Sequence, residues 1–174
     1  MNAQQRRESV LKSIESTRTP LSASSLAAQL GVSRQVIVGD VAILRAGGHD
    51  IMATARGYVM PELRDANQFL GKLACCHEPL KTRDELYAIV DAGAYVVDAI
   101  VEHELYGEIT GQLNLKNRGD VDHFIKKFEN SEVKLLSELT NGIHLHTIAC
   151  RDKAHFEDVY KILLAMGYLL PTWR

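Results

Sequence analysis

The chain has 174 residues, 46% of them hydrophobic, and a formal net charge of −2. This apolar content is sufficient for a packed core and excludes a globally disordered chain. The charges are unevenly distributed, because residues 1–60 carry seven Lys/Arg and four Asp/Glu whereas the remainder carries 13 and 18. So few charges can divide this way by chance, but a basic unit ahead of an acidic one is also typical of a DNA-binding domain joined to a separate module.

Export and membrane insertion are not indicated by the sequence. The N-terminus is polar and charged, and no apolar run approaches the ~20 residues that span a bilayer. The cysteines, Cys75, Cys76 and Cys150, are odd in number and two are adjacent, which predicts no disulfide framework. We therefore expect a cytoplasmic protein without a membrane partner.

Three helices are predicted at the start of the chain. Apolar residues recur at helical spacing within residues 3–15 and 23–30, and Gly31 is suited to end the second helix. Ser33 is a good N-cap for a third helix, which Gly47 stops. A short helix, a turn and a longer helix are the layout of a helix-turn-helix, whose second helix enters the DNA major groove.

The third helix carries both a core face and a candidate DNA-reading face. Ile37, Val41 and Leu44 fall on one apolar stripe and should face the core. In this motif the first turn of the helix meets base edges. The residues that we expect to contact DNA, including one from the wing described next, are Ser33, Arg34, Gln35, Arg45 and Arg56.

A wing and a domain boundary follow. Residues 50–60 read as two short strands around a turn in which Gly57 can take a positive φ, and Arg56 is placed to reach a phosphate or the minor groove. Pro61 marks a break, so we expect the boundary between Met60 and Asn67. The predicted domains are residues 1–62 and 67–174.

Strand and helix signals alternate in the second half. Asn141-Gly142 is the strongest hairpin signal in the chain. The pattern predicts an α+β fold: a winged helix-turn-helix, then an α/β sandwich with helices on one face of a largely antiparallel sheet. The expected strands are 70–76, 95–101, 108–115, 135–139 and 143–150, and the expected helices are 82–91, 121–129 and 152–164.

Two histidines on one predicted strand raise the possibility of a metal site. His144 and His146 are two residues apart and therefore share a face, and a pair of imidazoles makes half of a site for zinc, nickel, cobalt or copper. Solvent-exposed histidines at this spacing are equally common. His77, which ends an apolar strand, and Glu85, in the first turn of the next helix, would complete a set of three nitrogens and one carboxylate.

Each further candidate has a simpler interpretation. Residues 82–85, Thr-Arg-Asp-Glu, match a capping box, in which Glu85 would bond the backbone N–H of its own cap. Cys75 or Cys76 would offer a thiolate ligand, but neighbours on a strand point to opposite faces, so we expect one of them in the core. His103 is either a surface histidine or another ligand.

Several motifs together resemble one family. These are Ser33-Arg-Gln-Val-Ile-Val, Asp40-Val-Ala-Ile-Leu-Arg45, Ala53-Thr-Ala-Arg-Gly-Tyr58, Cys76-His-Glu with Glu85, Val101-Glu-His-Glu-Leu-Tyr-Gly-Glu108, Leu136-Ser-Glu-Leu-Thr140 and Gly142-Ile-His-Leu-His-Thr147. The combination resembles the niacin-responsive transcriptional repressors of bacteria, which join a winged helix-turn-helix to a three-histidine (3H) domain.

The resemblance implies a repressor of genes for NAD biosynthesis or niacin uptake, with nicotinic acid as co-repressor. It also implies effector-pocket roles for His103 and Tyr106. Gly39, where the family leads us to expect a polar residue, and Glu104, where we expect proline, depart from the pattern. The resemblance further implies a divalent metal, nickel or zinc, held by His77, Glu85, His144 and His146.

We therefore expect a homodimer that binds palindromic operator DNA and is not an enzyme. A metal with an open position can activate water, but apart from Glu78 no motif supplies an acid or base beside it. The alternative function is a metal-sensing regulator, in which nickel or zinc is itself the signal.

Overall fold

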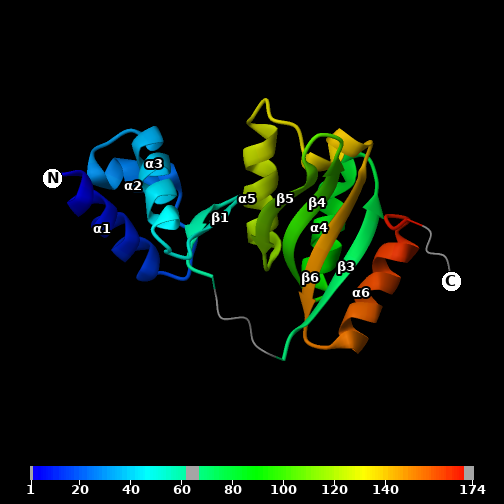
Figure 1. Ribbon diagram of the computed structural model, residues 1–174. Coiled ribbons are helices and arrows are strands. Elements are labelled where there is room, and N and C mark those ends of the chain that lie inside the picture. The colour runs from blue at the N-terminus through cyan, green and yellow to red at the C-terminus, as the bar shows by residue number, and fades with distance from the viewer. Residues whose placement is uncertain (1, 62–66, 171–174) are drawn as a thin grey trace. The chain divides into compact units, whose positions relative to one another are not determined.

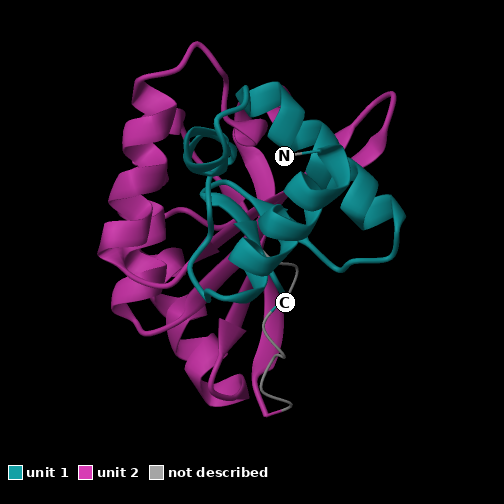
Figure 2. Ribbon diagram, turned by 90° about the vertical axis from the view of Figure 1, so that its left-hand side faces the viewer, with its two compact units in different colours: residues 1–63 teal, residues 64–174 magenta. Residues whose placement is uncertain are grey.

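The computed structural model describes residues 2–61 and 67–170 and divides the chain into two compact units, residues 1–63 and 64–174 (Figure 2). We call them unit 1 and unit 2. The boundary predicted between Met60 and Asn67 falls mainly on residues outside the described ranges.

Within residues 2–61, unit 1 forms three helices and a two-stranded sheet (Figure 1). Each helix starts at a side chain that accepts a backbone N–H, as expected for N-caps: Asn2, Ser22 and Ser33 bond the N–H groups of Gln5, Ser25 and Val36. The predicted helices and wing strands are confirmed. Their bounds are α1 Ala3–Glu15, α2 Ala23–Leu30, α3 Arg34–Ala46, β1 Met52–Thr54 and β2 Gly57–Val59.

The turn between α2 and α3 has helix-turn-helix geometry. Gly31 takes the left-handed conformation at φ 65° and ends α2, and the two helices are bent by 106° across the break, within the range of this motif. Among the described residues no single helix is long and apolar enough to cross a membrane, and only this bent pair passes such a test by length and composition. The layout expected from Ser33 and Gly31 is therefore confirmed.

Helix α3 is held by a core stripe and by an ion pair. Ile37, Val41 and Leu44 are buried, as predicted. Asp40, on the same side of the helix, is 3% exposed, and its carboxylate accepts two hydrogen bonds from the Arg6 guanidinium at 2.5 and 3.1 Å. Such two-pronged pairing fixes orientation as well as distance, so α1 restrains the rotation of α3.

The wing is attached to the rest of unit 1 through its second strand. Leu21 and Tyr58 exchange two backbone hydrogen bonds, each 2.8 Å long. Gly57, at φ 139°, makes this approach possible, because a Cβ atom there would lie 2.4 Å from the Leu21 carbonyl oxygen. Glycine is thus required at position 57 because a Cβ atom would clash with Leu21 and because the backbone has a positive φ.

Over residues 67–170, unit 2 forms a four-stranded antiparallel sheet in the order β3-β6-β4-β5, with helices on one face. Helix α4 lies between α5 and α6 (Figure 1). Phe156 of α6 packs directly over Gly71 of β3, where a Cβ atom would lie 2.2 Å from its ring. The elements are β3 Phe69–Cys76, α4 Thr82–Asp91, β4 Tyr95–His103, β5 Gly107–Leu115, α5 Arg118–Glu129, β6 Ile143–Cys150 and α6 Lys153–Ala165, with 3-10 helices η1 Pro79–Lys81 and η2 Leu136–Thr140.

The hairpin predicted at Asn141-Gly142 is wrong. Both residues have positive φ, 53° and 91°, but they join η2 to β6, and residues 136–140 form no strand. The Glu138 carboxylate accepts the Leu135 N–H at 2.7 Å, and the Gly142 N–H bonds the Ser137 carbonyl at 2.8 Å, which closes a helical turn. The left-handed pair therefore ends a helix here, a role that Asn and Gly also suit.

Candidate functional site

Three histidine rings meet one buried carboxylate between the sheet and α4. The Nε2 atoms of His77, His144 and His146 lie 2.6, 3.4 and 3.4 Å from Oε2 of Glu85. Each histidine side chain is 4% exposed, and that of Glu85 is fully buried. The structure therefore brings together the four residues for which a metal-binding role was expected.

Local structure explains this convergence. His144 and His146 project from alternate positions of β6, His77 follows directly after β3, and Glu85 lies in the first turn of α4. Gly142, at φ 91°, allows the end of β3 to approach, because a Cβ atom there would lie 2.5 Å from the His77 carbonyl oxygen.

All three imidazoles are oriented by their other ring nitrogen. The Nδ1 atoms of His77, His144 and His146 lie 2.9, 2.9 and 2.7 Å from the backbone carbonyl oxygens of Glu78, Gly142 and Asp98. A carbonyl oxygen only accepts, so each Nδ1–H donates and Nε2 faces Glu85. The same arrangement orients histidine ligands around metals and fixes their tautomer.

The cluster is also electrostatically coupled. Burial alone would lower the pKa of His77 and of His146, but the hydrogen bonds and negative charge of Glu85 outweigh burial and raise both pKa values. Burial would raise the pKa of Glu85, yet the charge of His146 and the hydrogen bonds from the three imidazoles hold it well below its usual value. The carboxylate is therefore ionised near neutral pH.

The capping-box interpretation of residues 82–85 is wrong. Helix α4 begins at Thr82 with Lys81 as its cap and without a side-chain cap bond. Glu85 instead turns toward the histidines. Among the described side chains, Thr82 Oγ1 and Glu85 Oε1 are buried without a hydrogen-bond partner. An unpartnered carboxylate oxygen beside three imidazoles fits a cation, because a cation would satisfy it.

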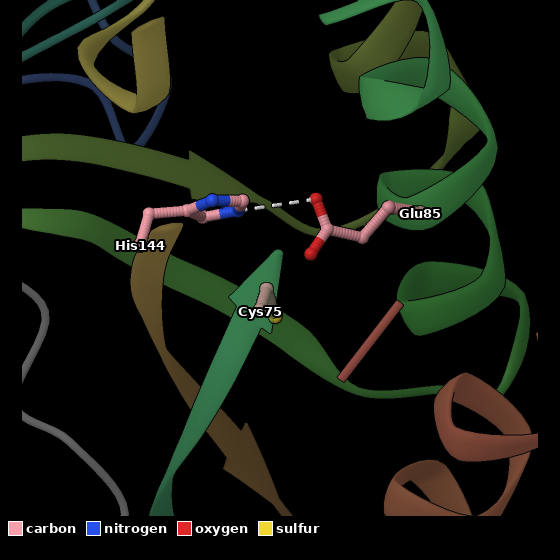
Figure 3. A group of neighbouring side chains, drawn as sticks. All are labelled: Cys75, Glu85 and His144. Atoms are coloured by element: carbon pink, nitrogen blue, oxygen red, sulfur yellow. Dashed lines mark ion pairs between the residues drawn. The ribbon is translucent and has the colours of Figure 1, made fainter. Parts of the chain in front are cut away.

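Cys75 lies beside this cluster, whereas Cys76 points to the opposite face of β3. Cys75 is completely buried and is paired with His144 across the adjacent strands. Figure 3 shows Glu85 of α4 and His144 of β6 directed toward each other, with Cys75 of β3 beside them. One ligand atom from each lies within 4.8 Å of the others, so the predicted core cysteine borders the histidine cluster.

Two supporting residues were not predicted. Asp98 lies at an irregularity in the register of β4, where its backbone carbonyl accepts from His146. Tyr168 follows α6 and places its ring 5.4 Å from that of His77, while its carbonyl accepts the Cys76 N–H. The acidic residue within an apolar strand was the one sequence signal for Asp98; nothing in the sequence pattern marked Tyr168.

Of the two residues expected in an effector pocket, His103 ends β4 and Tyr106 lies in the turn between β4 and β5. The His103 and Tyr106 rings are 5.1 Å apart, and His103 Nδ1 accepts the Leu105 N–H at 3.2 Å. Tyr106 is 72% exposed. These contacts lie within the turn itself, and the effector role of both residues stays a prediction.

The candidate DNA-binding residues occupy the expected elements. Arg34, Gln35 and Arg45 are exposed on α3, and Ser33 caps it through a 3.3 Å bond to the Val36 N–H. Arg56 lies in the turn of the wing and is half-buried. Exposure at the start of α3 is compatible with DNA contact, which the structure leaves as a prediction.

Comparisons with known proteins now decide the family. Residues 6–59 match a helix-turn-helix domain family and residues 71–172 match the 3H domain family. The chain belongs to the family of transcription repressors that carry a 3H domain. Its relatives include the transcription repressor NadR of Bacillus subtilis, 37% identical over 95% of this chain and 93% of that protein. The probable transcription repressor NiaR of Thermotoga maritima is 38% identical over 96% of this chain and 94% of that protein.

Membership confirms the resemblance seen in the sequence. The 3H-domain repressor is a transcription regulator that binds DNA through its helix-turn-helix and is not an enzyme. The predicted α+β fold, a winged helix-turn-helix followed by a largely antiparallel sheet with helices, is also confirmed.

Proposed function

We propose that the protein represses genes of NAD biosynthesis or niacin uptake, with nicotinic acid as co-repressor and a nickel or zinc ion in unit 2. The observation that carries the proposal is the convergence of His77, His144 and His146 on Glu85. The names NadR and NiaR belong to relatives that match nearly the whole chain.

The donor set fits a borderline divalent metal. Three imidazole nitrogens and a carboxylate suit nickel or zinc, whereas magnesium and calcium prefer oxygen donors alone. Each imidazole is held with Nε2 inward by a backbone carbonyl, and Glu85 Oε1 is unpartnered. When bound, such a metal supplies a Lewis-acidic position for the nitrogen or carboxylate of nicotinic acid.

The protein acts on DNA as a homodimer in this proposal. Two copies of α3 would reach half-sites of a palindromic operator about one helical turn (~34 Å) apart. Nicotinic acid promotes repression only if it binds the DNA-competent state better than the other state. His103 and Tyr106 are candidates for holding the effector.

Calorimetric titration of nicotinic acid into the full chain tests the proposal, once with zinc or nickel bound and once after treatment with a chelator. We expect binding with metal and none without it. His146→Ala should remove both metal and nicotinic acid binding, while the matched variant His123→Ala, which truncates an exposed histidine on α5, should retain both.

Two outcomes contradict the proposal. If nicotinic acid binds equally tightly after metal removal, the effector does not bind through a metal at the histidine cluster. If metal binds but nicotinic acid does not, and metal alone changes operator affinity, the protein is a metal sensor instead.

A further inference from the structure

Cys75 lies next to the histidine cluster. It pairs directly with His144 in the register of β3 and β6, and side chains paired in this way lie on one face of a sheet, with Cβ atoms about 5 Å apart. Glu85 of α4 points toward His144, as Figure 3 shows. The thiol, the carboxylate and the imidazole therefore come from three different elements to one point.

Distances in this group suit shared coordination. The nearest ligand atoms of Cys75, Glu85 and His144 all lie within 4.8 Å of one another. Two ligands on opposite sides of one metal are separated by about 4.4 Å, given a metal–sulfur bond of about 2.3 Å and a metal–nitrogen bond of about 2.1 Å. Small side-chain adjustments would thus place the sulfur in the coordination sphere.

Cys75 is fully buried, and its Sγ makes a long 3.8 Å contact to the carbonyl of Leu73. Burial, together with the charge and the hydrogen bond of the neighbouring Glu85 carboxylate, raises the pKa of the Cys75 thiol well above its usual value, so without a cation the thiol stays protonated beside that carboxylate. The neighbouring Glu85 side chain is also fully buried and has one oxygen without a partner. That oxygen is a second indication, separate from the spacing of the ligand atoms, that a cation belongs beside the Glu85 carboxylate.

Charge gives a further reason for a second anion. A divalent cation and one carboxylate leave one net positive charge, and the side chains around it are at most 4% exposed. An unbalanced buried charge is costly. A thiolate would make the metal and its ligands neutral overall.

We propose that Cys75 is a thiolate ligand of the divalent metal, in addition to the three histidines and Glu85. On binding, the S–H bond of Cys75 breaks, its proton leaves to solvent and a sulfur–metal bond forms, without any change in oxidation state. The inference rests on the proposed metal site. It adds a soft donor, which favours zinc and nickel over manganese or magnesium.

X-ray absorption spectroscopy of the zinc-loaded full chain tests this assignment, because a sulfur ligand adds a scattering shell at about 2.3 Å. We expect this shell in the wild type and in Cys76→Ser, and its loss in Cys75→Ser, with zinc still held by nitrogen and oxygen donors. Cys76 is a matched control since it points to the other face of the strand. A near-ultraviolet sulfur-to-cobalt charge-transfer band in the cobalt(II)-loaded protein should follow the same pattern.

The wild-type spectra decide the question even if Cys75→Ser fails to fold. Stoichiometric zinc with only nitrogen and oxygen neighbours overturns the role of Cys75 and leaves the histidine site standing. A sulfur shell that persists in Cys75→Ser also overturns it. If the wild type retains no metal at all, both this assignment and the proposed metal site are wrong.

Discussion

The backbone carbonyl of Asp98 accepts a 2.7 Å hydrogen bond from Nδ1 of His146. This contact depends on an irregularity in β4, where the register shifts between Val96 and Asp98. The Asp98 carboxylate stabilises the irregularity by accepting the Thr147 N–H at 3.0 Å. One residue thus positions His146 through its main chain and fixes its own main chain through its side chain.

Replacing Asp98 should therefore weaken metal binding without removing a proposed ligand. Asp98→Ala leaves the Thr147 N–H without its acceptor, and loss of such outer contacts typically lowers metal affinity ~10- to 100-fold. Asp98→Asn retains an oxygen acceptor and should remain close to wild type. Competition with a chelating dye measures both affinities; equal losses in the two variants would show that the carboxylate charge matters instead.

Gly142→Ala should also weaken the proposed metal site. The new Cβ atom would lie 2.5 Å from the His77 carbonyl oxygen, which forces the end of β3 away from His144. An alanine in the left-handed backbone conformation also lowers the free energy of unfolding by roughly 1–2 kcal/mol.

Gly107→Ala separates these two effects. Gly107 has a φ of 72°, but a Cβ atom there would have no neighbour within 4 Å. Both variants should lose thermal stability through backbone strain, and Gly142→Ala alone should lose zinc affinity. Comparable zinc affinities in the two would exclude the contact with His77 as the cause.

The stabilisation by zinc should increase with pH. Without metal, the raised pKa values of His77 and His146 mean that pairing with Glu85 stabilises the fold fully below the ordinary histidine pKa of about 6.5. This contribution to stability is lost as the pH rises through the raised pKa values of the two histidines. Metal binding requires neutral imidazoles, so it replaces the pairing at higher pH.

Thermal unfolding at pH 6 and pH 8, with and without zinc, measures this dependence. The rise in Tm on adding zinc should be larger at pH 8. A rise of the same size at both values would argue that zinc does not displace protons from these histidines. His146→Ala serves as the control and should show little zinc-dependent rise at either pH.

Arg34→Ala should weaken operator binding and reduce sequence discrimination. Arg34 is exposed at the first position of α3, and a good contact to a base edge is worth about 1–3 kcal/mol of discrimination. Titrations against the operator and a scrambled duplex measure the effect, with Arg18→Ala removing an equal charge outside α3. If Arg34→Ala weakens binding to both duplexes equally, the side chain contacts phosphate alone.

Gly39→Ala should stabilise unit 1. Gly39 is inside α3, and a Cβ atom there would meet nothing within 4 Å, so the helix-propensity gain of about 1 kcal/mol is available. Gly31→Ala, at φ 65°, should be destabilising. Chemical unfolding of both variants tests this contrast, and a destabilised Gly39→Ala would point to a role for the glycine that packing does not reveal.

The sequence predicted elements well where one local signal determined the structure. Apolar spacing and the caps at Ser33 and Asp152 located α3 and α6. It failed at residues 135–139 because Asn-Gly suits both a hairpin turn and a helix end. Only the pairing of β6 with β3 and β4 decides between them.

The same division applies to the candidate site. Alternation on a strand predicted that His144 and His146 share a face. The positions of His77 at a strand end and of Glu85 in the next helix made them candidates to complete the set, and the family resemblance implied all four as ligands. Local sequence could not decide whether Glu85 caps its own helix or contacts the histidines, because it lies in the first helical turn in either case. Only the tertiary fold decides between the two. For Asp98 the sequence offered only an acidic residue within an apolar strand, and for Tyr168 it offered no signal. The support from both residues comes from main-chain groups and from packing between distant segments, which a local pattern does not encode.

The Arg6–Asp40 ion pair has a practical consequence for anyone who handles this repressor. Arg6 lies in the first turns of α1, which Asn2 and Gln5 cap reciprocally. Removal of the first turn by a protease would remove that cap and weaken the restraint that Arg6 places on α3. Altered operator recognition in such a trimmed preparation would then come from loss of the Arg6–Asp40 ion pair rather than from loss of a residue that contacts DNA.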